Sequence, residues 1–527
     1  DGDFRGPLKA TVSGDEWESA SVQLFAFEDL RDVLVTPRDL VSSEGRKLPA
    51  AEIDVKVVKV WYQQGTAWGI ATPELLLHDD SLVVVDHAAH ENFLRCDYGS
   101  SSAYRWVSFD PTDVAHTGEG QVDLKWIHDA PKLVPFALQK DAFKQLMFTF
   151  HGAKGLKGGV YRGAFRVSVG GAKAFDLPVR VTALGFDLPD PCTFRDPQRR
   201  FFGAAYMGKL HFTVQDHPKM LANIARHNMK NFLMNPLFTP GDVEHHCRMF
   251  EAAGCDTDFL FGALPGCGVR TSYPARETDN GYLGYVNQLH AISNTMASLR
   301  TTLGKDFSAY SYGIDEGSAW TVRAERSTWK DAIHANGGRT VVATGWHPFI
   351  LFNLDYANVP RHPRHAKKEN ADAFHAGNPD GLIGWYADPH SGPENPDYTR
   401  RIYGWQTWRN NYDCSCQYIM YRDNWNDFWV PAEGALRGLM LVYPAADDIL
   451  DTIEWEGVRE AVDDVRYATC LQRLVAEGRR SGDVETDYAA RAAATWLSQV
   501  DCERSSLAYL RAETISRIRK LRKLLKK

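Results

Sequence analysis

The sequence predicts a multidomain fold in which an all-β sandwich precedes a (β/α)8 barrel and a helical segment follows the barrel. Two patterns predict this order. Short runs of alternating apolar and polar residues fill the first 191 positions, and a period of two is typical of half-buried strands. From about residue 201, short apolar runs alternate with long amphipathic stretches, as in repeated βα units around a parallel sheet. The predicted domains are therefore 1–191, 198–450 and 451–527.

Individual strands support the predicted N-terminal sandwich. Residues 52–62 (EIDVKVVKVWY) and 160–169 (VYRGAFRVSV) alternate apolar and polar side chains, and clusters of Gly, Asp and Pro separate such runs. Helical periodicity is nearly absent from this region. The run 175–184 (FDLPVRVTAL) leads into a segment rich in Pro and Asp at 187–197, which predicts the end of the first domain.

The central region contains the number of strands that a barrel needs. Seven short apolar runs lie at 201–207, 231–234, 258–263, 307–314, 340–344, 382–386 and 416–421, and an eighth lies near Tyr356 or Leu439. Helices are predicted at 218–229, 243–253, 285–303 and 322–336. This pattern favours a (β/α)8 barrel of about 250 residues, with a doubly wound open sheet as the alternative. The later helices, at 458–477, 487–500 and 505–527, are expected to pack on the barrel.

The composition argues against several functional classes. No apolar run in the 527 residues reaches the roughly 18 residues of a membrane span. The formal net charge of −7 gives no general attraction to nucleic acid, and the basic stretch 516–527 is expected to be a solvated helix end. Nine cysteines without a CxxC pair argue against a disulfide framework or a zinc ribbon. Cys414 and Cys416 are expected to be ordinary buried thiols, and no metal or cofactor is expected.

A pair of carboxylates marks the predicted site of chemistry. Asp315 and Glu316 follow the fourth predicted barrel strand, and this end of a barrel strand is where such folds place catalytic residues. Neighbours in a regular strand face opposite sides, but Gly313 and Gly317 allow both carboxylates to turn toward one pocket. Two nearby negative charges raise one pKa and so separate an acid from an anion. For the dipeptide alone, a structural salt bridge is the alternative.

Aromatic residues at other predicted strand ends indicate a sugar ligand. The apolar C–H faces of sugar rings suit aromatic platforms that carry a few polar groups. Each of these residues taken singly fits a core position better than a ligand wall, but several at successive strand ends favour a binding wall. The residues assigned to the pocket are Tyr312, Asn235, Trp346, Trp385, Tyr386, Tyr421 and Trp425.

Three separated stretches resemble the β-N-acetylgalactosaminidases of glycoside hydrolase family 123 and their wider relatives. The middle stretch, 312–316, ends in the carboxylate pair. The flanking stretches are Trp61 with 73–77 and 79–80, then 158–163, and finally 441–444 with 454–464. Their order matches a sandwich followed by a barrel. The sequence departs from the family pattern in Gly317-Ser318 after the pair and in 417–421 (QYIMY), where tryptophans are usual, and this leaves the sugar preference open.

The resemblance implies a retaining, substrate-assisted hydrolysis of terminal β-linked N-acetylgalactosamine. In this reaction the 2-acetamido oxygen of the sugar attacks its own anomeric carbon. By the resemblance, Glu316 protonates the departing glycosidic oxygen and later activates water, while Asp315 orients the acetamido N–H and stabilises its developing positive charge. The mechanism needs no metal and no cofactor.

Two other interpretations stay open. One is a glycosidase of different specificity with a conventional two-carboxylate mechanism, in which Asp388, Asp423 or Asp427 is the second carboxylate. The other is a non-catalytic carbohydrate-binding protein. The expected partner in each case is a glycan or glycoconjugate, not nucleic acid, and the oligomeric state is undetermined. The sequence starts at Asp1 and not at a methionine, as expected for a processed or trimmed form. A processed form favours a secreted or periplasmic location over a cytoplasmic one.

Overall fold

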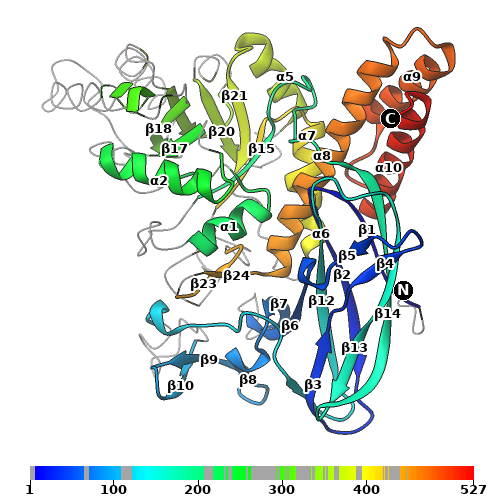
Figure 1. Cartoon of the computed structure of the whole chain (residues 1–527). Helices are drawn as coiled ribbons and strands as arrows, with labels where there is room; N and C mark the ends of the chain where they lie inside the picture. Colours follow the sequence, from blue (N-terminus) through cyan, green and yellow to red (C-terminus); the bar gives the residue numbers. More distant parts are fainter. Residues whose placement is uncertain are drawn as a thin grey trace, which may run out of the picture. The chain divides into compact units, whose positions relative to one another are not determined.

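The protein is represented by a computed structural model, which divides into two compact units (Figure 1). Unit 1 comprises Asp1–Pro189, Ser391–Pro396 and Asn424–Asp463, and unit 2 comprises Asp190–His390, Asp397–Asp423 and Asp464–Lys527. The segment predicted at 451–527 is therefore divided between the units after Asp463.

The structure describes a defined part of the chain, namely residues 6–63, 70–107, 122–206, 218–230, 233–234, 240–256, 259–262, 294, 297–298, 300–302, 304, 308–315, 334, 339–347, 351, 354–360, 367–386, 395–418, 420–421, 425, 440–446 and 448–527. At 233–234, 240–243, 246, 259–262, 308–309 and 311–315 the description covers the backbone alone.

Unit 1 is built on three sheets and a short hairpin. A seven-stranded sheet runs in the order β1-β14-β13-β3-β11, with β4 paired to β13 and β5 paired to β4; a four-stranded sheet runs β2-β12-β6-β7, and a three-stranded sheet runs β10-β9-β8. The strands are β1 (Leu8–Gly14), β2 (Glu16–Phe25), β3 (Leu30–Thr36), β4 (Leu40–Ser42), β5 (Lys47–Leu48), β6 (Ile53–Gln63), β7 (Ile70–Leu77), β8 (Val83–Asp86), β9 (Glu91–Asp97), β10 (Ser102–Trp106), β11 (Phe136–Leu138), β12 (Phe143–Gly152), β13 (Gly159–Val169) and β14 (Ala172–Asp187). The hairpin strands are β23 (Tyr443–Pro444) and β24 (Ile449–Leu450).

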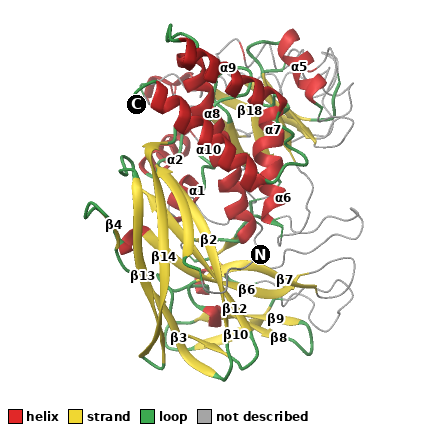
Figure 2. Ribbon diagram, turned by 90° about the vertical axis from the view of Figure 1, so that its right-hand side faces the viewer, coloured by secondary structure: helices red, strands yellow, loops and turns green. Residues whose placement is uncertain are grey.

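The two larger sheets of unit 1 lie face to face (Figure 2), and aromatic rings fill the space between them. Phe148 and Phe150 of β12 stack on Phe165 of β13, with ring centroids 5.6 and 6.4 Å apart. All three side chains are fully buried. The alternation predicted for 52–62 and 160–169 belongs to β6 and β13, because every second side chain of each strand enters this core.

A buried carboxylate joins stretches of unit 1 that are far apart in sequence. Glu74 of β7 accepts hydrogen bonds from the indole N–H of Trp61, from the amide of Gln63 at 2.7 Å and from the hydroxyl of Tyr443 at 3.0 Å. The Tyr443 ring also packs edge-on against Trp61 at 5.1 Å. Because an unpaired buried carboxylate is costly, these three donors explain how Glu74 is tolerated in the core.

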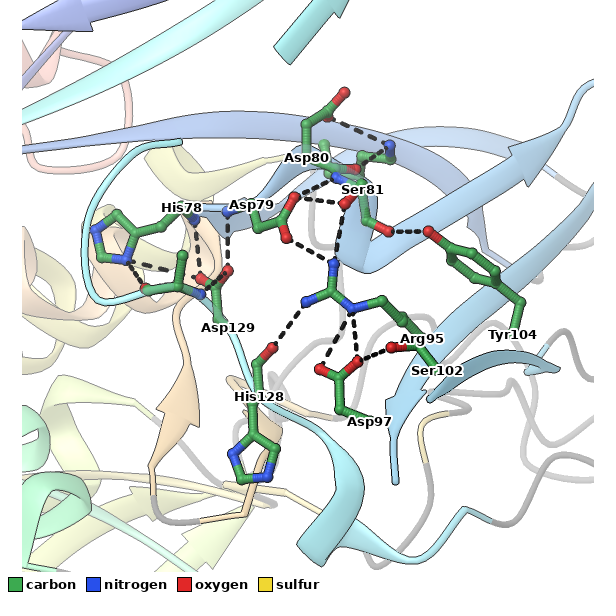
Figure 3. A network of polar contacts seen from close by, with 12 residues as sticks. His78, Asp79, Asp80, Ser81, Arg95, Asp97, Ser102, Tyr104, His128 and Asp129 are labelled. Carbon is green, nitrogen blue, oxygen red and sulfur yellow. Dashed lines mark hydrogen bonds and ion pairs between the residues drawn. The ribbon is translucent and has the colours of Figure 1, made fainter. Parts of the chain in front are cut away.

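A polar network centred on Arg95 ties β9 to its neighbours in unit 1 (Figure 3). The Arg95 guanidinium donates to Asp79 at 2.6 Å and to Asp97 at 3.1 Å. The Asp129 carboxylate accepts the backbone N–H groups of His78 and Asp79 at 2.8 and 2.9 Å. These hydrogen bonds hold the end of β7 and the loop at 128–130 in place. Because the polar groups of the network bond to one another, we assign the network a structural role.

Unit 2 contains one sheet of eight parallel strands in the order β15-β22-β21-β20-β19-β18-β17-β16. The strands are β15 (Phe202–Ala205), β16 (Leu233–Met234), β17 (Phe259–Gly262), β18 (Ser308–Asp315), β19 (Arg339–Ala343), β20 (Tyr356–Pro360), β21 (Leu382–Tyr386) and β22 (Cys414–Gln417). The eighth strand lies at Tyr356, which is one of its two predicted positions, whereas Leu439 lies outside the described residues. The last strand starts two residues earlier than the predicted run at 416–421.

The sheet curls, as a barrel sheet does. Tyr356 of β20 packs edge-on against Phe202 of β15 at 6.3 Å and against Tyr310 of β18 at 6.2 Å. Neither β15 nor β18 is a neighbour of β20 in the sheet, so these rings meet across its concave face. The strand order follows the sequence and excludes the doubly wound alternative, whose order reverses at a switch point. A ladder between β15 and β16, which would close the barrel, is absent from the pairings of the described residues.

Helices surround the sheet and form the last part of the chain (Figure 1). They are α1 (Pro218–Arg226), α2 (Pro240–Ala252), α5 (Lys368–Gly377), α6 (Pro396–Arg400), α7 (Thr407–Arg409), α8 (Ile453–Gly478), α9 (Val484–Gln499) and α10 (Leu507–Leu524), with a π-helical turn at Arg401–Gln406. The helices predicted at 285–303 and 322–336 lie largely outside the described residues. Asp483 and Ser506 cap α9 and α10 through their side chains. No helix among the described residues is long and apolar enough to cross a membrane.

Candidate active site

The strand β18 is irregular where it reaches Asp315, the first residue of the predicted carboxylate pair. In the ladder between β18 and β19, Tyr312 pairs with Val341 and Asp315 pairs with Ala343. Three steps along β18 therefore oppose two steps along β19, which is the geometry of a bulge. The backbone irregularity predicted from Gly313 is present at this point. Asp315 is the last residue of the strand, at the end where barrels carry catalytic groups.

Several residues predicted for the site lie outside the described residues. Glu316 and Asn235 are among them, as are Asp388, Asp423 and Asp427, which the two-carboxylate alternative would use. For Tyr312 and Asp315 the backbone alone is described. Their roles therefore stay predictions, and the surroundings of the pair come from the neighbouring strands.

The strand register places a row of residues beside Asp315. Ala343 pairs with Asn358 of β20, and Asn358 pairs with Gly384 of β21. A Cβ atom at Gly384 would lie 2.5 Å from the Tyr356 hydroxyl and 3.0 Å from the Asn358 side-chain oxygen. Any larger residue at this position would displace both side chains, so glycine leaves room for polar groups on the concave face.

Asn358 and Tyr356 form a buried polar centre on this face. The Tyr356 hydroxyl donates to the Asn358 side-chain oxygen at 3.2 Å, and the Asn358 amide donates to the Tyr206 hydroxyl at 3.3 Å. Burial holds the pKa of the Tyr356 hydroxyl well above its usual value, so Tyr356 stays a donor. The chain of bonds fixes the ring of Tyr206, which directly follows β15.

Three tyrosines form an aromatic wall at the carboxyl ends of the strands. The Tyr206 ring lies 6.4 Å from Tyr386 at the end of β21 and 5.7 Å from Tyr418 just after β22. Backbone bonds from Tyr206 to the Gln417 carbonyl and from Met420 to the Tyr206 carbonyl, both 2.8 Å, keep the segments side by side. Tyr418 is 40% exposed, and the wall therefore reaches solvent.

Tyr386 belongs to the predicted pocket, but the sequence analysis did not single out Tyr206 or Tyr418. Tyr206 closes the first predicted strand at 201–207, so its position at a strand end was a usable signal. Tyr418 was placed within a strand predicted at 416–421, whereas β22 ends at Gln417. The earlier end of the strand brings Tyr418 into the wall.

Trp385 lies on the other face of the sheet, although it was predicted to share a wall with Tyr386. Successive strand residues face opposite sides, and Trp385 packs on Tyr412 at 4.9 Å. Its register partner Ser415 donates to the Thr407 hydroxyl of α7 at 2.9 Å, which identifies this face as the helix side. Trp385 therefore supports the packing of helices on the sheet.

The other predicted aromatic residues have different surroundings. Trp346 lies just after β19 and is half-buried, while Tyr421 is buried beyond β22. Trp425 belongs to unit 1, where its indole is fully buried, packs on Tyr443 at 5.2 Å and donates to the Pro444 carbonyl at 2.8 Å.

The two ends of the sheet differ in their ionisable groups. At the carboxyl ends, burial lowers the pKa of His347, which follows β19. At the amino ends, burial raises the pKa of Asp413 to about 6 despite the nearby Arg195 and Arg199, and burial together with Arg195 lowers the pKa of His375 to about 3. Asp413 also accepts the Ile383 N–H at 3.0 Å. This second cluster pins β21 to β22, away from the end that carries Asp315.

The cysteines of the described residues show no sign of chemistry. Eight cysteines among the described residues are free, and Cys414 and Cys416 are buried, as predicted. Burial raises the pKa of the Cys414 and Cys416 thiols far above the usual value. Within either unit taken by itself, the described residues contain no group of three His, Cys, Asp or Glu side chains close enough to share a metal ion.

The comparisons with known proteins bear on this arrangement. No family model matches the sequence, and no curated protein matches it. Among solved structures, the chain is similar to a family 123 glycoside hydrolase from Clostridium perfringens, with a TM-score of 0.62 and 10% identity over 98% of this chain and 93% of that chain. The chain thus has the fold of a family 123 glycoside hydrolase, as the sequence resemblance predicted.

Weaker likenesses involve other glycoside hydrolases. A family 2 β-galacturonidase from Eisenbergiella tayi has a TM-score of 0.34 and 10% identity over 85% of this chain and 89% of that chain. The family 5 enzyme PbGH5A from Prevotella bryantii has a TM-score of 0.30 and 11% identity over 50% of this chain and 96% of that chain. These scores are too low to add to the argument.

Proposed function

We propose that this protein is a glycoside hydrolase that removes terminal β-linked N-acetylgalactosamine by a retaining, substrate-assisted mechanism. The observation that carries the proposal is the likeness in fold to a family 123 glycoside hydrolase over 98% of the chain. The structure of that enzyme was used to detail glycolipid glycan hydrolysis. The position of Asp315 at the end of β18 and the tyrosine wall at the carboxyl ends of strands in the same sheet support the same proposal.

In the proposed reaction the acetamido oxygen of the substrate is the nucleophile. It bonds to the anomeric carbon while Glu316 donates a proton to the departing oxygen, and water then opens the cyclic intermediate with Glu316 as base. Asp315 holds the acetamido N–H and balances its growing positive charge. The net reaction consumes one water and retains the anomeric configuration.

The tyrosine wall has a binding role in this proposal. Aromatic faces contact the apolar side of a pyranose ring, and phenol hydroxyls reach its hydroxyl groups. Tyr206 is suited to the task because its hydroxyl is already held by Asn358 at 3.3 Å. A residue that folding has fixed loses little freedom on binding.

The test uses paired chromogenic substrates, the β-galactoside and the N-acetyl-β-galactosaminide. We expect the parent to cleave the acetamido substrate alone, and Glu316→Gln and Asp315→Asn each to lower kcat/KM by about 100-fold or more. Matched controls are Glu503→Gln and Asp380→Asn, since both residues are exposed. Their activity is expected to equal that of the parent.

Other outcomes point to the alternatives. Equal cleavage of both substrates would contradict substrate assistance and favour a conventional pair of carboxylates. Absence of cleavage, together with sugar binding that survives Glu316→Gln, would favour a non-catalytic binding protein. Proton NMR of the first product formed decides between retention and inversion.

A further inference from the structure

Three phenylalanines form an exposed cluster at one end of the four-stranded sheet of unit 1. Phe25 ends β2, Phe143 begins β12, and the two residues pair directly across the strands. Phe27 lies in the loop after β2. The Phe25 ring is 4.8 Å from Phe143 and 4.9 Å from Phe27. The exposed fractions are 37% for Phe25, 63% for Phe143 and 82% for Phe27. We call these three residues the aromatic tip.

Backbone hydrogen bonds fix the two loops that carry the aromatic tip. The Ala26 N–H donates to the Ala142 carbonyl at 3.2 Å, and the Asp141 N–H donates to the Ala26 carbonyl at 2.8 Å. The Asp29 carboxylate also accepts the Lys140 N–H at 2.8 Å. The backbones that carry the rings are therefore fixed before any ligand arrives, which lowers the entropic cost of binding.

Packing within unit 1 does not account for the exposed rings of the aromatic tip. A well-packed phenylalanine removes most of its apolar area from water, whereas Phe27 and Phe143 leave more than half of theirs exposed. Contiguous exposed apolar groups on a soluble protein commonly mark a binding surface. The cluster therefore calls for a ligand.

Neighbouring polar groups indicate the chemistry of that ligand. The next cross-strand pair on the same face of the sheet is Gln23 and Gln145, because side chains recur on one face every second residue. Carboxylates of Glu28 and Asp141 flank the loops and are exposed. Aromatic faces beside amides and carboxylates match the apolar C–H faces and the hydroxyl groups of a sugar. The exposed acidic residues of these loops, Glu28, Asp29 and Asp141, outnumber the exposed Lys140, and this balance of charge disfavours an anionic membrane or a nucleic acid.

We propose that the aromatic tip is a non-catalytic binding surface for uncharged pyranose rings of a glycan chain. The proposal rests on the proposed function only in that glycans are the substrate class. The tip belongs to unit 1, whereas the carboxylate pair belongs to unit 2. Its binding is therefore separable from turnover, and it would hold a polymeric or clustered glycan to the enzyme.

The test is affinity electrophoresis in native gels that contain asialo-mucin, galactomannan or xyloglucan. The variants are Phe27→Ala with Phe143→Ala, and the control is Phe175→Ala, another exposed phenylalanine of unit 1 at 46%. At least one glycan is expected to retard the parent and the control. The double variant is expected to lose about tenfold in affinity, with unchanged kcat/KM on small chromogenic substrates.

Several results would overturn the proposal. One is that no gel retards the parent. Another is that the parent and the double variant are retarded equally. Binding of the parent to phosphatidylcholine vesicles that the double variant loses would assign the tip to a membrane instead. Dissociation of a dimer in the double variant, seen by sedimentation, would assign it to a second copy of the chain. Gel retardation needs no turnover, so failure of the proposed hydrolase activity would leave this test unaffected.

Discussion

Replacing Asp464 by asparagine is expected to cost unit 2 a large part of its stability. The Asp464 carboxylate is fully buried in α8. Arg400 of α6 donates to its two oxygens at 2.7 and 2.9 Å, and Arg511 of α10 donates to one of them. The same Arg511 guanidinium lies 4.7 Å from the Tyr467 ring centroid. One carboxylate thus joins three helices.

The magnitude follows from the charges left behind. Asparagine keeps the shape and one acceptor, but its amide hydrogens would face the donors of Arg400 and Arg511. Breaking a buried ion pair on one side costs about 3–5 kcal/mol. Burial raises the pKa of Asp464, but the two guanidinium groups outweigh burial and hold it below the usual value. The stabilisation is therefore present above about pH 3.9 and is lost as the pH falls through the lowered pKa.

Urea unfolding at pH 7, followed by tryptophan fluorescence, measures the effect. Asp487→Asn is the control, because Asp487 pairs with Arg491 at 2.8 Å on the exposed side of α9. An exposed helical pair of this kind contributes about 0.3–0.5 kcal/mol. If Asp464→Asn costs no more than the control, the buried carboxylate does not hold the three helices together.

Two further predictions concern unit 2. Tyr386→Ala is expected to raise KM for the chromogenic sugar about fivefold to tenfold. Trp385→Phe is expected to lower the midpoint temperature of unfolding and to leave KM unchanged. Equal effects of the two variants on KM would refute the assignment of Tyr386 and Trp385 to opposite faces of the sheet. For His375, with a pKa lowered to about 3, the unfolded chain binds a proton below about pH 6.5 that the folded chain does not. Stability is therefore lost as the pH falls, and His375→Gln should reduce this loss by up to about 1.4 kcal/mol per pH unit. If the free energy of unfolding changes with pH equally in the parent and in His375→Gln between pH 7 and 5, the prediction is wrong.

Local periodicity was enough to predict the strands of unit 2. The run at 382–386 coincides with β21, and the other predicted strands lie within a few residues of the observed ones. Apolar runs of four to eight residues between amphipathic helices carry this information locally. The end of β22 was missed because the ladder stops at Gln417, and the Met420 N–H bonds instead to the carbonyl of Tyr206, just after β15.

The side-chain clusters required the tertiary structure. Glu74 meets Tyr443 across 369 positions, and Asn358 meets Tyr206 across 152. Composition and spacing contain no record of such pairs, because they depend on strand register and on how strongly the sheet curls. For the same reason no sequence pattern indicated that Trp425 packs on Trp61 in the core of unit 1.

The sequence by itself determined the order of a β-rich region, a parallel-sheet region and terminal helices, and it placed Asp315 at the end of β18, the fourth strand of the parallel sheet in chain order. These features follow from hydrophobic periods and turn residues within short segments. Only the tertiary structure decided that Tyr386 faces the concave side while Trp385 faces the helices, and that Tyr206 and Tyr418 complete the wall. The physical reason is that a strand presents alternate residues to opposite faces, and the bulges and strand ends that set this alternation are fixed by pairing with distant strands.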